Sequence, residues 1–342
     1  MKKKMTGKEI AKLAGVSPTT VSLVKKGKVG VSAEKRDEIL QIMREHGYSE
    51  MEQTARKRKT VALLFRDDLY DLKQLFYNEI ISCILKYSKD LPYNILVRSI
   101  NYDETTMEGN VFSDCSDWDA AIICSDPNNV ILCQLFQENI PFVVLDSSVE
   151  SKLSCSVCVD YEAAAYQMTR YLLENGHRKL AYIGNARNSA EHSFTLHTFS
   201  GFHRAMLESG LSAGTDMICM NASDETRLKQ FLDTAIHQIE KPTAIFSSTD
   251  CNAILSMQYL RAQGIRIPEE ISIVGMDDIS ISAYTTPGLT TIHVDRDEMV
   301  RLCLELLNDI LHGKHPKSVC ITPTLLVERE SVDKRRGTEK QN

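Results

Sequence analysis

The chain has 342 residues, of which 43% are hydrophobic and 25% charged, a composition typical of a soluble globular protein of about two domains. No run of about 18 apolar residues occurs, and no apolar segment follows the basic N-terminus, so we expect a cytoplasmic protein without a membrane span or secretory signal. Residues 1–60 hold fifteen Lys and Arg against seven Asp and Glu, whereas residues 61–342 hold twenty-five against thirty-nine. A basic head on an acidic body is typical of a polyanion-binding module joined to a separate domain.

Three short helices are predicted in the first fifty residues. Thr6-Gly7-Lys8-Glu9 forms a capping box, and the helix that it begins ends at Gly15. Ser17-Pro18 then has the form of an N-cap followed by proline at the first helical position, which predicts a second helix over residues 18–25. Ser32 is expected to cap a third helix that ends near residue 45. Two short helices joined by a glycine-containing turn indicate a helix-turn-helix.

The second helix of such a unit lays its N-terminal residues against base edges in the DNA major groove. We expect its exposed positions to contact bases and the basic residues around it to contact phosphates. The predicted DNA-binding residues are Thr6, Ser17, Pro18, Thr19, Thr20, Ser22, Leu23, Lys25, Lys26, Arg56 and Lys57.

From residue 60 onward, short apolar runs alternate with helical patterns. This alternation predicts parallel sheets covered by helices, in which ligands bind at the carboxyl ends of strands. Strands are expected at residues 61–65, 93–97, 120–124, 142–146, 179–184, 244–247 and 271–275. Helices are expected at residues 76–87, 128–139, 160–175, 194–209 and 250–263.

The remaining motifs argue against catalysis and against a metal site. Among ten cysteines, only Cys155 and Cys158 form a C-x-x-C pair, and in a strand these two positions face opposite sides. No G-x-S-x-G, H-E-x-x-H, P-loop or G-x-G-x-x-G motif occurs. We therefore expect no enzyme, no metal and no cofactor.

Residues 10–22, with Val31-Ser32, Arg36 and Gly47-Tyr48, are similar to the headpiece of the lactose-repressor/galactose-repressor (LacI/GalR) family. The body resembles the core of the same family at residues 159–164, 176–184, 200–202, 242–246, 267–278 and 285–292. The resemblance implies an α/β fold with two parts. An all-α helix-turn-helix headpiece would precede a bilobed, periplasmic-binding-protein-like core with two parallel sheets.

The resemblance also implies domain boundaries. Residues 1–48 would form the DNA-binding domain, 49–60 the hinge, 61–330 the effector-binding and dimerisation core, and 331–342 a tail. Within the core, the N-lobe would comprise about 61–159 and 293–322, and the C-lobe about 160–292 and 323–330. We expect the tail to be disordered from Lys334 onward.

In family members the cleft between the lobes binds a sugar or purine-like effector, and lobe motion changes DNA binding. Asp277 follows a strand and would accept hydrogen bonds from two hydroxyl groups, unless it only organises a turn. Phe76 and Tyr77 match an aromatic pair at the pocket, although helix burial or dimer contact would explain them equally. The predicted effector-binding residues are Phe76, Tyr77, Asp146, His197, Thr198, Thr249, Asp250 and Asp277.

Several positions depart from the family pattern. Leu23 and Lys26 stand where Arg and Asn are usual, which predicts a different half-site preference. Lys57 occupies the position of the hinge leucine that wedges into the minor groove. Thr198 replaces an arginine of the pocket, and Glu225 stands where a stacking aromatic residue is usual.

Together these features predict a transcriptional repressor that binds a pseudo-palindromic operator as a homodimer and responds to a small, sugar-like effector. One alternative is a regulator without effector control, which the residues at 198 and 225 favour. The other is a solute-binding protein, which would need an export signal and would have no headpiece.

Overall fold

The computed structural model describes residues 7–25, 31–45, 58–66, 75–100, 115, 117–127, 129–147, 149, 154–186, 193–314 and 319–335. The chain divides into two compact units, Met1–Lys59 and Thr60–Asn342. No helix in the described ranges is long and apolar enough to cross a membrane.

The first unit contains the three predicted helices, α1 Gly7–Leu13, α2 Pro18–Lys25 and α3 Ala33–Glu45. Gly15 has a φ of +61°, the left-handed conformation that the end of α1 requires. On α1, Leu13 is 51% exposed, whereas Ala11 is buried in the core. The three helices enclose a small core of Ile10, Ala11, Ala14, Val21, Val24, Ile39 and Met43.

The second unit contains a six-stranded sheet of order β11-β5-β4-β3-β1-β2. The pairings of β1 with β3, β3 with β4, β4 with β5 and β5 with β11 are parallel. The strands are β1 Lys59–Arg66, β2 Tyr93–Ile100, β3 Ala120–Cys124, β4 Phe142–Leu145, β5 Ser154–Val159 and β11 Val319–Thr322.

A second, four-stranded sheet has the order β7-β6-β8-β9, and all its pairings are parallel. A two-stranded antiparallel sheet joins β10 to β12. The strands are β6 Leu180–Ile183, β7 Ile218–Cys219, β8 Ala244–Ser247, β9 Ser272–Val274, β10 Thr291–Val294 and β12 Thr324–Val327.

Both large sheets are buried on both faces, because successive apolar side chains point to opposite sides. Leu63 of β1 belongs to one core cluster, and its neighbours Ala62 and Leu64 belong to another. In β6, the neighbouring side chains of Tyr182 and Ile183 likewise belong to two different core clusters. This explains why the strands appear in the sequence as continuous apolar runs, and it confirms the predicted α/β class.

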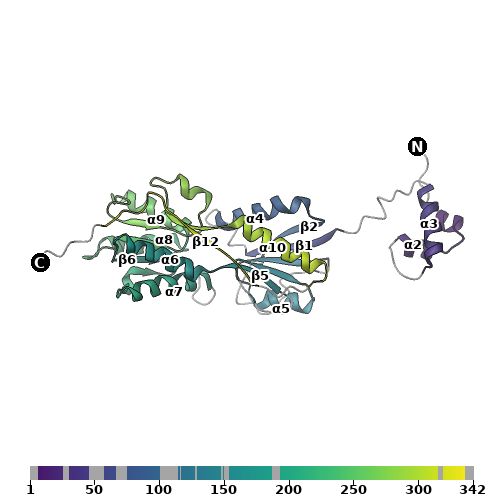
Figure 1. Cartoon of the computed structure of the whole chain (residues 1–342), viewed down its shortest axis with the longest axis horizontal. Coiled ribbons are helices and arrows are strands. Elements are labelled where there is room, and N and C mark those ends of the chain that lie inside the picture. The colour runs from purple at the N-terminus through teal and green to yellow at the C-terminus, as the bar shows by residue number, and fades with distance from the viewer. Residues whose placement is uncertain are drawn as a thin grey trace. The chain divides into compact units, whose positions relative to one another are not determined.

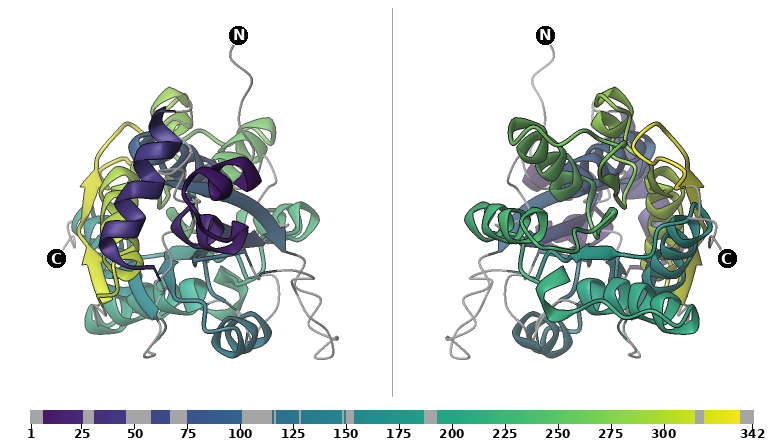
Figure 2. Two further views of the ribbon diagram at one scale, coloured as in Figure 1. Left: turned by 90° about the vertical axis from the view of Figure 1, so that its right-hand side faces the viewer. Right: turned by 90° about the vertical axis from the view of Figure 1, so that its left-hand side faces the viewer.

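Helices cover each face of the two sheets, as Figures 1 and 2 show. We call the six-stranded sheet with its helices the first lobe, and the four-stranded sheet with its helices the second lobe. The helices of the first lobe are α4 Leu75–Tyr87, α5 Asn129–Gln137 and α10 Arg296–Leu311. Those of the second lobe are α6 Tyr161–Glu174, α7 Ser193–Glu208, α8 Glu225–Ile236 and α9 Asp250–Ala262.

The helix α8 was absent from the predicted elements, although its sequence carries a start signal. The Asp224 side chain accepts a hydrogen bond from the Thr226 N–H at 2.8 Å, as an N-cap does. The strand predicted over residues 142–146 ends one residue earlier, because Asp146 has a φ of +71° and leaves the sheet.

The expectation that the tail is disordered from Lys334 was wrong for the first two of its residues, which lie in the described region. The Arg335 N–H donates to the Asn175 carbonyl at 2.8 Å, and its guanidinium donates to the Glu270 carbonyl at 2.6 Å. The buried His177 ring bonds to the Asp333 carbonyl at 3.1 Å. These contacts hold the chain against the second lobe up to residue 335.

Candidate DNA-binding helix and effector site

The N-terminus of α2 is built as the sequence predicts. The Ser17 hydroxyl accepts a hydrogen bond from the Thr20 N–H at 3.0 Å and lies 2.9 Å from the Thr20 hydroxyl. Val21 and Val24 face the core and are almost completely buried. Pro18 and Thr19 of the same helix are exposed, which leaves its N-terminus accessible to a ligand.

Among the predicted DNA contacts, Ser17, Pro18 and Thr19 are exposed, whereas Ser22 and Leu23 are half-buried. Thr20 is half-buried as well, because its hydroxyl turns toward the N-cap. The Lys25 side chain and four whole residues lie outside the described residues, namely Thr6, Lys26, Arg56 and Lys57.

In the second unit, carboxylates gather where strands of both lobes end. Asp146 directly follows β4 of the first lobe, and Asp277 lies three residues beyond β9 of the second. Both have positive φ, +71° and +117°, which ordinary side chains rarely adopt. These are the positions at which open parallel sheets bind ligands. We call this region the interlobe site.

The Asp146 carboxylate is held by two tyrosines from different lobes. Tyr77 of α4 donates to Oδ2 at 2.6 Å, and Tyr161 of α6 donates to Oδ1. Burial raises the pKa of Asp146 to about 7, although the two hydrogen bonds oppose the shift. Asp146 thus receives a hydrogen bond across the lobes, and both its oxygens are already occupied.

Asp277 differs from Asp146, because none of the described residues places a side-chain donor on its carboxylate. Its side chain is only 5% exposed. Burial raises the pKa of Asp277 well above its usual value, and the neighbouring Asp250 and Asp146 charges raise it further, while Arg296 opposes them. The Asp250 backbone also hydrogen-bonds to this carboxyl and lowers its pKa, and the remaining acceptor positions can receive the hydroxyls of a ligand.

Asp250 is fully buried and serves its own lobe. Thr291 donates to Oδ1 at 2.5 Å, and Oδ2 accepts from the Ser282 hydroxyl at 2.6 Å and the Ile279 N–H at 3.1 Å. Burial raises the pKa of Asp250 to about 7. Through these bonds Asp250 holds residues 279–291 in place, and its contact with an effector stays a prediction.

Three more of the predicted effector residues are engaged elsewhere. Thr198 is completely buried and its hydroxyl lies 2.7 Å from the Tyr182 hydroxyl, so it does not replace the missing arginine. Thr249 caps α9 through the Asn252 N–H at 3.3 Å. Phe76 is 6% exposed and packs in the main core. His197 is exposed on α7. The Thr198 and Thr249 hydroxyls and the Phe76 ring are therefore engaged within the protein, and their contact with an effector stays a prediction.

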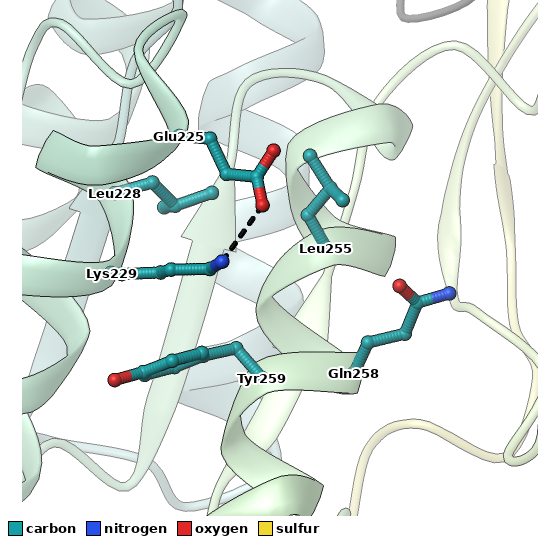
Figure 3. A pocket seen from close by; sticks show the side chains of 6 residues that line it. All are labelled: Glu225, Leu228, Lys229, Leu255, Gln258 and Tyr259. Atoms are coloured by element: carbon teal, nitrogen blue, oxygen red, sulfur yellow. Dashed lines mark ion pairs between the residues drawn. The ribbon is translucent and has the colours of Figure 1, made fainter.

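Glu225 lies in a pocket of about 220 Å³ between α8 and α9, shown in Figure 3. Its carboxylate pairs with Lys229 at 2.8 Å, and the Lys229 ammonium lies 5.9 Å from the centre of the Tyr259 ring. The Tyr259 hydroxyl donates to Asp233 at 2.8 Å. Glu225 is thus neutralised within its own helix and does not take the part of a stacking aromatic residue.

The sequence reasoning missed several residues of the interlobe site. Tyr161 was not among the predicted effector-binding residues, although it is an aromatic residue at a strand-to-helix junction. Asp126 lies two residues beyond β3 and belongs to no recognisable motif. Its carboxylate accepts a hydrogen bond from the Ser193 hydroxyl of the second lobe at 2.7 Å. Arg296 and Glu79, which form an ion pair at 3.0 Å beside Asp277, carry no motif that would reveal them.

The described residues contain no group of three or more His, Cys, Asp or Glu placed to hold a metal ion. No disulfide joins any of the ten cysteines, all of which lie in the described residues. Cys155 faces the main core while Cys158 is half-buried outside it, as expected for a pair on opposite faces of a strand.

Two family descriptions match parts of the chain. Residues 6–50 match bacterial regulatory proteins of the lacI family, and residues 169–332 match the periplasmic binding protein-like domain. The HTH-type transcriptional repressor PurR of Aliivibrio salmonicida (strain LFI1238) is 27% identical over 338 residues, which cover 96% of this chain and 99% of that protein. PurR of Vibrio atlanticus (strain LGP32) is 28% identical over 336 residues, which cover 96% and 98%.

Solved structures have the same fold. A transcriptional regulator CelR–cellobiose complex matches with a TM-score of 0.68 at 22% identity, over 96% of this chain and 99% of that one. A LacI family regulator from Enterococcus faecium with bound ribose matches with a TM-score of 0.68 at 21% identity, over 81% and 100%. The chain thus carries a lacI-family DNA-binding segment and a periplasmic binding protein-like domain, and it is similar over 96% of its length to transcriptional repressors of this family.

Proposed function

We propose that the protein represses transcription as a homodimer that reads a pseudo-palindromic operator in the cytoplasm, where the DNA lies. The observation that carries this proposal is the exposed N-terminus of α2 on a compact three-helix unit, with Ser17 as its cap. Residues 18–23 would meet base edges in the major groove, and Lys25, Lys26, Arg56 and Lys57 would meet phosphates or the minor groove.

A second copy of the chain would bind through the apolar residues that α4, β2 and residues 280–284 expose. Leu85, Val97, Ile281 and Tyr284 are 44%, 39%, 47% and 84% exposed. The Ser280 N–H donates to Glu79 of α4 at 2.9 Å, which places residues 280–284 beside this helix. Large exposed apolar side chains on neighbouring elements are typical of a subunit interface.

A small, hydroxyl-rich effector would bind between the lobes and change operator affinity. Asp277 is the best-supported contact, because its buried carboxylate has no side-chain donor among the described residues. Tyr77, Tyr161 and Asp146 would form the facing wall. The neighbours with cellobiose and ribose support a sugar-like ligand in a fold of this kind.

A regulator without effector control is the second candidate. It is favoured by the interlobe hydrogen bonds that already satisfy Asp146 and by the internal bonding of Thr198. The two candidates differ in whether any small molecule changes operator affinity.

The experiment that tests the main proposal is selection of duplexes from a random DNA pool by the full-length protein at near-physiological salt. We expect a symmetric enriched motif, whose duplex then serves as the probe for compounds that release or strengthen binding. Salt-sensitive retention without any enriched motif would contradict sequence-specific repression.

A further inference from the structure

The backbone that carries Asp277 is unusual at two successive residues. Asp277 and Asp278 have φ of +117° and +51°, a backbone region that residues other than glycine rarely adopt. Such a conformation persists only where the surroundings hold it. Inside the second lobe, Arg329 and His293 hold the Asp278 carboxylate at 2.6 and 2.8 Å. The strand β10 also holds the main chain of the turn, because the Asp277 N–H donates to the Ile292 carbonyl at 3.0 Å.

The main chain is held from the first lobe by one arginine. Arg296 begins α10, which packs on β3, β4 and β5. Its two terminal nitrogens donate to the carbonyls of Asp277 and Asp278, the second at 2.8 Å. Its Nε lies 3.0 Å from Oε2 of Glu79. All three guanidinium nitrogens are therefore engaged.

Glu79 completes the arrangement from α4. Its second oxygen, Oε1, accepts the Ser280 N–H at 2.9 Å, so the same carboxylate touches both the arginine and the turn. The Arg296 and Glu79 side chains are only 12% and 26% exposed. A shielded pair of this kind resists salt and water far more than surface pairs do. We call Arg296, Glu79 and the bonds that they make to residues 277–280 the turn clamp.

The helix α4 connects the clamp with other parts of the molecule. Two residues before Glu79 it carries Tyr77, which donates to Asp146, and further on it exposes Leu85. A rigid helix that touches the interlobe site at one end and the exposed apolar surface at the other can transmit a displacement between them.

We propose that Arg296 and Glu79 are positioning residues that couple the Asp277 turn to α4, so that a ligand at Asp277 changes operator affinity through the clamp. This rests on the proposed function. Lysine at 296 would keep the charge but not the planar fork that reaches two carbonyls and a carboxylate at once. Glutamine at 79 would keep the acceptor for Ser280 but lose the charge.

The test uses the full-length protein, the variants Arg296→Lys and Glu79→Gln, and the controls Arg301→Lys and Glu305→Gln. Arg301 and Glu305 form an exposed pair at 2.6 Å on the same helix. We expect amide hydrogen exchange in residues 277–284 to become at least tenfold faster in the clamp variants only. We also expect the Kd for the selected operator to change at least fivefold, with an unchanged slope against salt, because no phosphate contact is lost.

Two results would overturn the coupling. One is exchange that is unchanged, or that rises equally throughout the molecule, as general destabilisation would produce. The other is wild-type affinity for the operator in both clamp variants. If the wild-type protein itself enriches no duplex, the proposed function fails and the coupling fails with it, whereas normal wild-type binding with unaltered variants overturns the coupling alone.

Discussion

Thr19 is the exposed position of α2 that is best placed to touch a base, because its neighbours Ser17 and Thr20 are occupied with the helix cap. We predict that Thr19→Ala weakens discrimination at one base pair of each half-site by about tenfold, as the loss of about 1–3 kcal/mol of direct readout would do. Repeating the duplex selection with the variant measures this. Gln41→Ala, an exposed change on α3, serves as the control, and an enriched motif identical to wild type for Thr19→Ala would remove it from the reading surface.

His177 gives a prediction for stability against pH. Burial, and after it the charge of the nearby Arg335, lowers the pKa of its ring from an ordinary value of 6.5 to about 4. Between pH 6.5 and pH 4 the ring is protonated in the unfolded chain but stays neutral in the folded protein. The free energy of unfolding therefore decreases as the pH falls from 6.5 to 4. We expect a loss of up to about 3 kcal/mol. Urea unfolding at several pH values should show a shallower slope for His177→Gln, and parallel curves would contradict the assignment.

At the scale of elements, the pair α6 and α7 depends on one glycine. A Cβ at Gly201 would lie 2.1 Å from the Glu162 carbonyl oxygen and 2.8 Å from the Tyr166 nitrogen, so the helices approach more closely than any side chain allows. Gly201→Ala would force the helices apart, at a cost of about 1–3 kcal/mol for an overpacked core. Ser200→Ala, one position earlier on the exposed face, is the matched control. Equal unfolding midpoints for the two variants would show that the helices separate without cost.

At the scale of the whole molecule, the homodimer would depend on the apolar surface of α4, β2 and residues 280–284. Tyr284 is 84% exposed, and a charge there would be buried without a partner in a dimer. We predict that Tyr284→Asp shifts the protein to monomer in sedimentation and weakens operator binding at least tenfold, since one half-site reader contacts too few base pairs. Ile239, which is fully exposed, is the control position for the same substitution. A variant that still sediments as a dimer would place the interface elsewhere.

Local patterns in the chain predicted the headpiece helices and the strands β1, β2, β3, β4, β6, β8 and β9, because those features depend on near neighbours. The strands β7, β10 and β11 and the helix α10 were not among the predicted elements. The cap at Ser17 and the stop at Gly15 need only a few adjacent residues, and the buried strands need only their own apolar runs. The helix α8 was not predicted, although Asp224 is a typical N-cap residue. The many polar residues of this helix make the helical spacing of its apolar residues difficult to recognise.

The amino-acid sequence by itself determined the two-part organisation, the α/β class and the reading helix, because caps, turns and periodicity act over a few residues. Only the tertiary structure decided which polar residues meet. It turned Thr198 and Asp250 inward, left the Asp277 carboxylate without a side-chain donor, and brought Arg296 to a turn nineteen residues before it in the chain. The physical reason is that the partners of a side chain depend on how elements far apart in the chain pack together, and a local sequence pattern does not determine that packing.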